Sequence, residues 1–242
     1  MSIWLRILLV LVSLATAVVL LAAIAFRDKR PKVFFAAERG DTNFIARYLA
    51  SSNDVNRSVI YYPAGRRYAP LLDVAVTSGQ LDTVGFLLNK GANPNQPDST
   101  GETPLMWAIG RIRNEVAAET RIEILKMLLK AGADPNLKAS STYTYAPLLK
   151  AASLGQSEMV SILLAAGADV NVTNTVGQTA LHLADNAQIA RLLIAAGADT
   201  TIRAERGETP AESAARQKNL DVLAVLTNAP AQTNRIKSNG EN

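Results

Sequence analysis

A short motif repeated along the chain restricts its fold more than any other feature of the sequence. The motif ends in Gly-Ala-Asn or Gly-Ala-Asp and places its glycines at positions 91, 132, 167 and 197, which gives spacings of 41, 35 and 30 residues. A repeat of about 33 residues is one small supersecondary unit. Such a unit is too thin to bury its own apolar face, so neighbouring copies must stack. The sequence therefore predicts a solenoid.

Each unit also opens with its own motif, usually a threonine or alanine followed by proline and leucine. Proline suits the first turn of a helix, where its missing N–H is not needed. The glycines at 79 and 155 suit the left-handed end of a first helix, and the apolar residues at 159–164 have the spacing of a second helix. The five openings are Ala69-Pro70-Leu71, Thr103-Pro104-Leu105, Ala146-Pro147-Leu148, Thr179-Ala180-Leu181 and Thr209-Pro210-Ala211.

These opening motifs and Gly-Ala-Asp loops together resemble the ankyrin repeat family over residues 67–228, with a degenerate first copy at 33–56. The resemblance implies an all-α ankyrin-repeat solenoid of about six helix-turn-helix units with short β-hairpin-like fingers. The repeat domain is expected over residues 32–228, and residues 229–242 are expected to form a disordered tail. The units are 33–56, 68–95, 101–136, 145–171, 177–202 and 207–228, of which the last is a polar cap.

Three units depart from the pattern. The fourth is preceded by a loop, 137–144, that is longer by two residues, and Tyr145 after it is expected either to contact a partner or to pack on the neighbouring finger. The third contains an insertion between Ala108 and Leu125, which we interpret either as a lengthened first helix or helical protrusion, or as an addition to a loop tip. The fifth is short, because Asn186-Ala187 replaces the turn that elsewhere contains a glycine. We expect this fifth unit to be locally remodelled and to form the weakest joint of the stack.

The N-terminal segment differs in composition from the repeats. Residues 7–26 contain no charged side chain. At about 1.5 Å per residue a helix of this length crosses a hydrocarbon core of about 30 Å. We therefore expect residues 1–31 to form a transmembrane anchor or a signal segment, with one hydrophobic helix that precedes the repeats.

Two interpretations of this segment stay open. In the favoured one it is retained as a single-pass anchor, and the basic residues Arg27, Lys29, Arg30 and Lys32 place the repeats on the cytoplasmic side. In the alternative it is a signal segment cleaved near Ala25, which leaves a periplasmic or secreted protein.

The residues needed for catalysis or cofactor binding are scarce. The chain has no cysteine and one histidine, and it shows no glycine-rich phosphate loop and no zinc-ligand spacing. We expect no catalytic, metal or cofactor site and no small-molecule substrate. Basic residues in the repeats alternate with acidic ones, so nucleic acid is not expected either. The resemblance implies a structural hydrogen bond for His182.

The resemblance also implies a function: a non-catalytic scaffold that binds a partner protein on its concave face, through fingertips and exposed first-helix positions. Carried over by position, the finger residues are Arg66, Tyr68, Ser99, Thr100, Glu102, Tyr143, Tyr145, Thr175, Val176 and Gln178. The first-helix residues are Thr77, Ser78, Trp107, Arg111, Ser153 and Leu154. In the alternative with a cleaved signal, the protein is an exported soluble inhibitor or protective partner.

Overall fold

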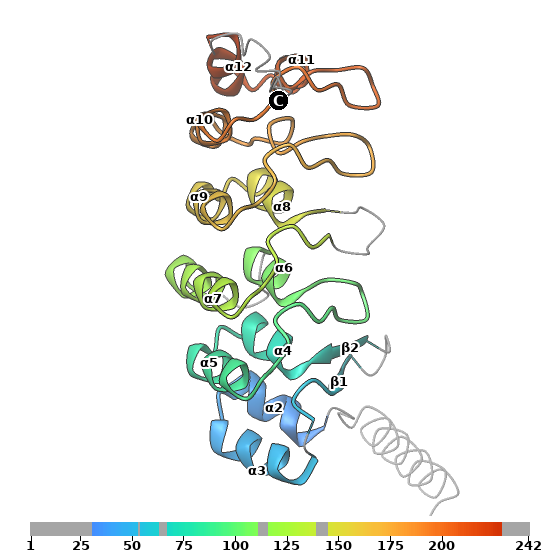
Figure 1. Cartoon of the computed structure of the whole chain (residues 1–242), viewed down its shortest axis with the longest axis vertical. Helices are drawn as coiled ribbons and strands as arrows, with labels where there is room; N and C mark the ends of the chain where they lie inside the picture. Colours follow the sequence, from blue (N-terminus) through green and yellow to red (C-terminus); the bar gives the residue numbers. More distant parts are fainter. Residues whose placement is uncertain (1–30, 53, 63–66, 111–115, 139–144, 229–242) are drawn as a thin grey trace, which may run out of the picture.

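The protein is a row of stacked helical units (Figure 1). This computed structural model describes residues 31–52, 54–62, 67–110, 116–138 and 145–228. The helices form two parallel columns, and the loops that join successive units project from one side as fingers. Because each unit contacts mainly its neighbours, the fold is an elongated stack rather than a ball.

The inner column lies next to the fingers, and the outer column lies on the far side of the stack (Figure 1). The inner helices are α2 (Lys32–Arg39), α4 (Leu71–Thr77), α6 (Pro104–Ile109), α8 (Pro147–Ser153) and α11 (Pro210–Arg216). The outer helices are α3 (Thr42–Ser52), α5 (Leu81–Asn89), α7 (Ala118–Lys130), α9 (Ser157–Ala165), α10 (Ala187–Ala195) and α12 (Leu220–Thr227).

Buried apolar residues form one continuous core between the two columns, from Val33 in the first unit to Leu226 in the last. The described helices have six to 13 residues, or about two to four turns, and few helices of that length are stable in water without tertiary packing. The core crosses every joint, so the units stabilise one another.

Local sequence explains where most inner helices begin and end. Pro104, Pro147 and Pro210 each occupy the first turn, and Thr209 and Glu212 form a reciprocal capping box at the start of α11. At the turn between helices, Gly79 and Gly155 adopt φ of +70° and +72°. In the last unit Lys218 takes that place with φ of +59°, as the one non-glycine residue with positive φ in the described part of the chain.

The second unit starts one residue later than its motif suggests. Pro70 precedes α4 as its N-cap, and Leu71 takes the first helical position that Pro104 and Pro147 take elsewhere. The expected match of Ala69-Pro70-Leu71 to the other openings is therefore wrong by one residue. As a result Asp73 occupies the repeat position of Met106, Leu149 and His182.

A ladder of asparagine side chains fastens the return loops of successive units together. The Oδ1 atoms of Asn56, Asn95, Asn136 and Asn171 accept backbone N–H groups of the next loop at 2.7–2.8 Å. The Nδ2 groups of Asn95 and Asn136 also donate to the carbonyl oxygens of Gly132 and Gly167. In the fifth loop Thr201 stands in place of the asparagine, and its backbone N–H and hydroxyl both donate to Asp199 of the same loop.

The fifth unit corrects the expectation of six helix-turn-helix units. It has no first helix: residues 180–183 form turns, and Asn186 then caps α10 by accepting the N–H of Ile189 at 3.0 Å. Ala180, Leu181 and His182 are nevertheless buried, so the turns fill the place of a helix in the core. The expected local remodelling is confirmed.

The fingers are mostly turns. In the described residues one finger forms a sheet, in which β1 (Ser58–Tyr62) and β2 (Arg67–Pro70) pair antiparallel with Val59 opposite Ala69. The fold is thus mostly helical with one small two-stranded sheet.

The insertion in the third unit does not lengthen the first helix as one interpretation expected. Helix α6 ends at Ile109, and Gly110 is extended, with φ of −64° and ψ of 170°. The second helix α7 is longer instead, with 13 residues against nine in α5 and α9. The remaining insertion residues, 111–115, lie outside the described residues.

No helix within the described ranges is long and apolar enough to span a bilayer. The apolar residues 7–26 lie outside those ranges, as does the tail at 229–242.

We predict that the fifth unit exchanges its amide hydrogens faster than the fourth. Its joint to the fourth unit includes long hydrogen bonds, from Asp185 N–H to Ala152 O at 3.3 Å and from Asn186 Nδ2 to Gly155 O at 3.4 Å. Hydrogen exchange with mass spectrometry should therefore show lower protection in residues 180–195 than in α8 and α9. Equal protection would contradict a weak joint there.

We predict that Asn136→Ala lowers the free energy of unfolding by about 1–2 kcal/mol, because two hydrogen bonds to the next loop are lost where water can partly replace them. Urea denaturation measures this change. Asn89→Ala removes an exposed asparagine of α5 that is not part of the ladder, and it should change stability by less than about 0.5 kcal/mol. Equal effects of the two variants would show that the ladder does not stabilise the stack.

Candidate functional site

The candidate binding surface, which we call the finger face, consists of the fingers and the exposed side of α4, α6 and α8. These elements lie on the side of the stack to which the loops project (Figure 1). Fingers and first helices carry every residue that the sequence assigned to partner binding, so the geometry of this face decides which of them can act together.

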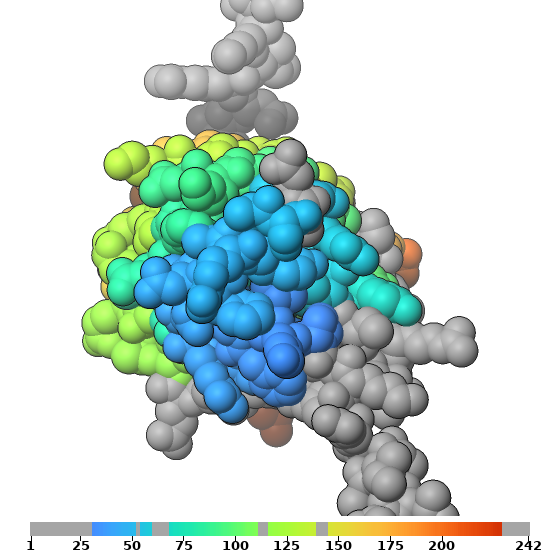
Figure 2. Space-filling view, turned by 90° about the horizontal axis from the view of Figure 1, so that it is seen from below, coloured from blue at the N-terminus to red at the C-terminus, as the bar shows by residue number. Residues whose placement is uncertain are grey.

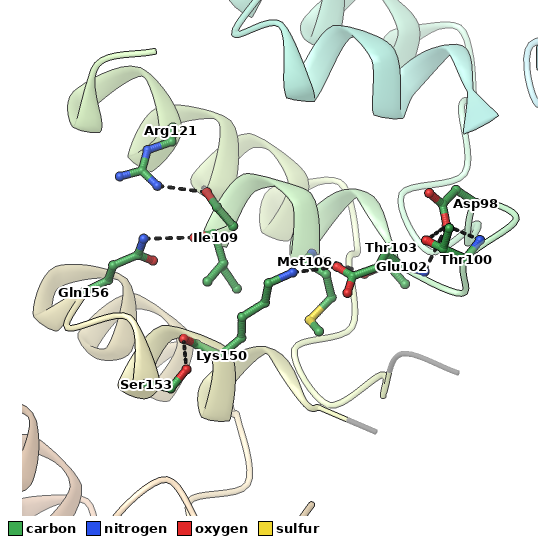
Figure 3. Close-up of polar contacts among 11 residues, drawn as sticks. Asp98, Thr100, Glu102, Thr103, Met106, Ile109, Arg121, Lys150, Ser153 and Gln156 are labelled. Atoms are coloured by element: carbon green, nitrogen blue, oxygen red, sulfur yellow. Dashed lines mark hydrogen bonds and ion pairs between the residues drawn. The ribbon is translucent and has the colours of Figure 1, made fainter. Parts of the chain in front are cut away.

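Three side chains from two units meet on the finger face, and Figure 3 shows two of them, Glu102 and Lys150. The Nζ atom of Lys150 lies 2.6 Å from Oε2 of Glu102 and 5.8 Å from the centre of the Trp107 ring. Both charged side chains are about one-fifth exposed, which limits screening by water. The three residues therefore form a fixed polar and aromatic cluster that joins the third unit to the fourth.

Lys150 was missed in the sequence analysis, although it occupies the same repeat position as Trp107. Each follows the residue at the His182 position of its own unit, Leu149 in one case and Met106 in the other. Superposing the openings of the two units would have identified Lys150. Its pairing with Glu102 depends on the stacking distance and was not evident from the sequence.

Each finger takes the number of the unit that it precedes, so the third finger is the loop around residues 98–102. Hydrogen bonds hold this finger in one shape. Asp98 Oδ1 accepts the backbone N–H groups of Thr100 and Glu102 and the hydroxyl of Thr100 (Figure 3). Ser99 Oγ accepts the backbone N–H of Tyr68 at 2.9 Å, which ties this finger to the preceding one. Ser99, Thr100 and Glu102 thus lie on a rigid loop, with part of their hydrogen-bonding capacity already used.

In the described part of the fingers, two large apolar side chains are exposed. Tyr68 is 44% exposed and Val176 is 37% exposed. Thr175 is also exposed, and the amide oxygen of Gln178 accepts a hydrogen bond from Asn174 Nδ2 at 3.1 Å. Tyr145 is partly buried against a small cluster that includes Val172. Val172 lies at the start of the next finger, so this packing agrees with the alternative in which Tyr145 packs on the neighbouring finger.

The first-helix residues differ in their availability. Ser153 is exposed, while Leu154, Thr77 and Ser78 are partly buried. The hydroxyl of Thr77 donates to the carbonyl oxygen of Asp73 at 2.8 Å, so it already has a partner inside α4. Arg66, Arg111 and Tyr143 lie outside the described residues.

His182 lies in the floor of a hollow of about 380 Å³ between the fifth and sixth fingers, near Val176, Arg206 and Glu208. Its Nδ1 atom accepts the backbone N–H of Thr179 at 3.1 Å, which requires the proton to be on Nε2. Nε2 then donates to the carbonyl oxygen of Glu208 in the next unit at 3.1 Å. Burial lowers the pKa of His182, which favours this neutral form. The histidine therefore has the structural role that the resemblance implied.

Asp73 is the least expected group near the finger face. It is 1% exposed, and neither carboxylate oxygen has a hydrogen-bond partner in the described part of the chain. Burial raises its pKa well above the ordinary value of 3.8, and the negative charges of Asp98 and Glu102 raise it further. Asp73 therefore opposes folding when it is ionised.

Across the described ranges, no group of three or more histidine and acidic side chains could hold a metal ion.

Comparison with known proteins agrees with the repeat pattern. A family model described as ankyrin repeats (three copies) matches residues 33–139 and 148–237. Two curated relatives are a glycerophosphocholine phosphodiesterase of Schizosaccharomyces pombe, 38% identical over 41% of this chain, and an L-asparaginase of Dirofilaria immitis, 33% identical over 62%. The chain spans only 9% and 23% of their respective lengths.

Among solved structures, one similar chain is part of the complex between the predatory endopeptidase Bd0816 of Bdellovibrio bacteriovorus and the immunity protein Bd3460. The match has a TM-score of 0.66 and 25% identity, and it covers 82% of this chain and 97% of that one. The similarity therefore extends over nearly the whole of the matched chain.

We predict that Asp73→Leu stabilises the protein by about 2 kcal/mol at pH 7, because it removes a buried carboxyl that has no partner among the described residues. Leu149 and Met106 occupy the equivalent position in other units, so an apolar side chain fits there. The unfolded chain ionises this carboxyl near pH 3.8, whereas the folded chain keeps its proton to higher pH. The destabilisation by Asp73 therefore grows as the pH rises above that value, and the gain should shrink as the pH falls towards 4.

Urea denaturation at several pH values measures the gain. The control Asp82→Leu removes an exposed carboxylate from α5 and should change stability little at any pH. A destabilising effect of Asp73→Leu at pH 7 would mean that the buried carboxyl has a favourable partner.

Proposed function

The chain belongs to the ankyrin repeat family, and we propose from this membership that it is a non-catalytic protein-binding module, held at a membrane, that docks a partner protein on its finger face. Ankyrin repeats indicate a protein partner. We assign binding to the finger face mainly because of the cluster of Glu102, Trp107 and Lys150. Its contacts already fix these side chains in the absence of a partner.

The composition of the finger face supports docking. Aromatic residues anchor many protein interfaces because they bury a large area at small entropic cost, and fixed polar groups around them select the partner. Tyr68 and Val176 supply exposed apolar groups, and the hydrogen-bonded third finger supplies fixed polar ones. Because these side chains are already fixed, they lose little conformational entropy when a partner binds.

The repeats offer little support for an enzyme. His182 is committed to two neighbouring backbone groups, so it has no oriented acidic partner with which to act as a base. The two relatives with enzyme names share only a small part of their length with this chain, so their activities do not carry over.

The membrane part of the proposal rests on the sequence of residues 7–26, which is uncharged, and on the basic residues that follow it. An anchor would concentrate the repeats near other membrane proteins and so strengthen weak binding. The basic flank favours repeats on the cytoplasmic side.

A second candidate is an exported soluble binding protein that inhibits or protects its partner after cleavage near Ala25. The similar chain in the complex of an endopeptidase with its immunity protein favours this candidate. The N-terminal residue of the natural protein separates the two: a start at Phe26 supports export, and a start at Met1 or Ser2 supports an anchor.

We predict that the double variant Tyr68→Ala and Val176→Ala loses its partner. Affinity capture from native membranes with quantitative mass spectrometry should recover the bound protein at least about tenfold less well, since buried interface anchors typically contribute about 2 kcal/mol or more. The matched control is Leu81→Ala with Leu220→Ala, which removes two large apolar side chains, 36% and 70% exposed, from outer helices. Unchanged capture by a folded finger-face variant would refute this surface assignment.

A further inference from the structure

We propose that the open end of the first unit lies on the anionic headgroups of the membrane that anchors the chain. The surface consists of Lys32, Arg39, Phe44, Arg47 and Tyr48, and we call it the basal face. This inference rests on the membrane anchoring proposed above. It adds a contact between the repeats and the headgroups that determines the orientation of the stack relative to the bilayer.

The basal face contains positions that a preceding unit would otherwise cover. Thr83 and Ile124 begin the buried side of the outer helices in the second and third units, and both are fully buried. Phe44 holds the same position in α3, directly before the buried Ile45, yet it is only partly buried. In the described residues α3 packs against α2 and α5. Among the described residues, the first unit therefore ends the stack with a large aromatic group at its surface.

Basic side chains lie over the aromatic rings of this unit. The guanidinium of Arg47 lies 6.0 Å from the centre of the Phe44 ring, and that of Arg39 lies 5.9 Å from the centre of the Phe35 ring. Arg39, Arg47 and Lys32 are all exposed. Figure 2 views the stack from below, with the atoms of the first unit on the near side. Aromatic rings beside basic groups suit the boundary between headgroups and acyl chains.

The distance along the chain from the apolar segment to the basal face is short. From Phe26, the last apolar residue, to Lys32, the first residue of α2, there are six peptide steps. These reach at most about 22 Å even when fully extended. The headgroup layer on each side of a bilayer is itself several ångströms thick. An anchored chain therefore holds its first unit beside the headgroups, while the last unit is free to lie far from them.

The charge at this end of the chain complements an anionic surface. Residues 27–47 contain six basic and three acidic side chains, a net charge of +3, whereas the whole chain has a net charge of only +4. One of the three acidic groups, Asp41, accepts the backbone N–H of Phe44 at 2.9 Å and caps α3. Each basic residue near an anionic membrane favours binding by about fivefold at low salt.

The test uses the full-length chain, which has no natural cysteine and so accepts a single fluorescent label. One label is attached at Asn43→Cys on α3 and, in a separate protein, at Ala224→Cys on α12, both exposed positions. The proteins are reconstituted in vesicles of phosphatidylcholine with phosphatidylglycerol, and a headgroup spin label on the lipid serves as the quencher. We expect strong quenching at position 43 and little at position 224.

Charge variants then test the recognition of lipid. The pair Arg39→Gln and Arg47→Gln should weaken docking of the basal face about 30-fold at low salt, which abolishes most quenching at position 43. The control pair Arg191→Gln and Arg206→Gln removes the same charge from exposed positions in later units and should leave quenching unchanged. Phosphatidylcholine vesicles without phosphatidylglycerol should give the same loss as the basal-face pair.

The outcomes separate this inference from the proposed function. A chain that floats with vesicles but shows equal quenching at positions 43 and 224 overturns the basal-face contact and leaves the anchor intact. Quenching that is equal in neutral and anionic vesicles overturns the recognition of anionic lipid. Protection of position 43 that grows with protein concentration assigns the face to a second copy of the chain and also overturns it. A chain that alkaline carbonate washes off the membrane overturns the anchor, and this inference with it.

Discussion

Each helix in this protein is too short to be stable alone, so every unit depends on apolar contact with the unit beside it. The continuous core from Val33 to Leu226 supplies that contact. It also explains why the fifth unit tolerates the loss of a whole helix. Ala180, Leu181 and His182 still fill the space between the neighbouring units, and the stack requires a filled space rather than a particular backbone shape.

The repeat spacing was sufficient to predict the stack, because stacking is determined by apolar residues that recur at a fixed period. Details that depend on one or two residues were harder to predict. Pro70 fits the opening motif in sequence but lies one residue before its helix, and only the structure shows that Asp73 is consequently buried. The fifth unit lacks the glycine-containing turn between its two helices. The sequence did not show that residues 180–183 would consequently form turns in place of the first helix.

The candidate site shows the same division. Family position correctly placed Glu102 and Trp107 on one side of the stack, since repeat positions fix the direction of side chains. The pairing of Glu102 with Lys150 depends on how far a lysine reaches across one stacking distance, and no repeat pattern encodes that. The hydrogen bonds that make the third finger rigid likewise arise from Asp98, a residue to which the sequence assigned no role.

The asparagine ladder has a consequence for how such a protein can lengthen. Asn95 and Asn136 show the same bonds to the loop that follows, so a duplicated interior copy would find a matching neighbour on each side. A copy added after α12 would not, because the final unit has lost the Gly-Ala-Asp sequence of the ladder loops. Growth of the array by gene duplication is therefore favoured in the middle and disfavoured at the carboxyl end.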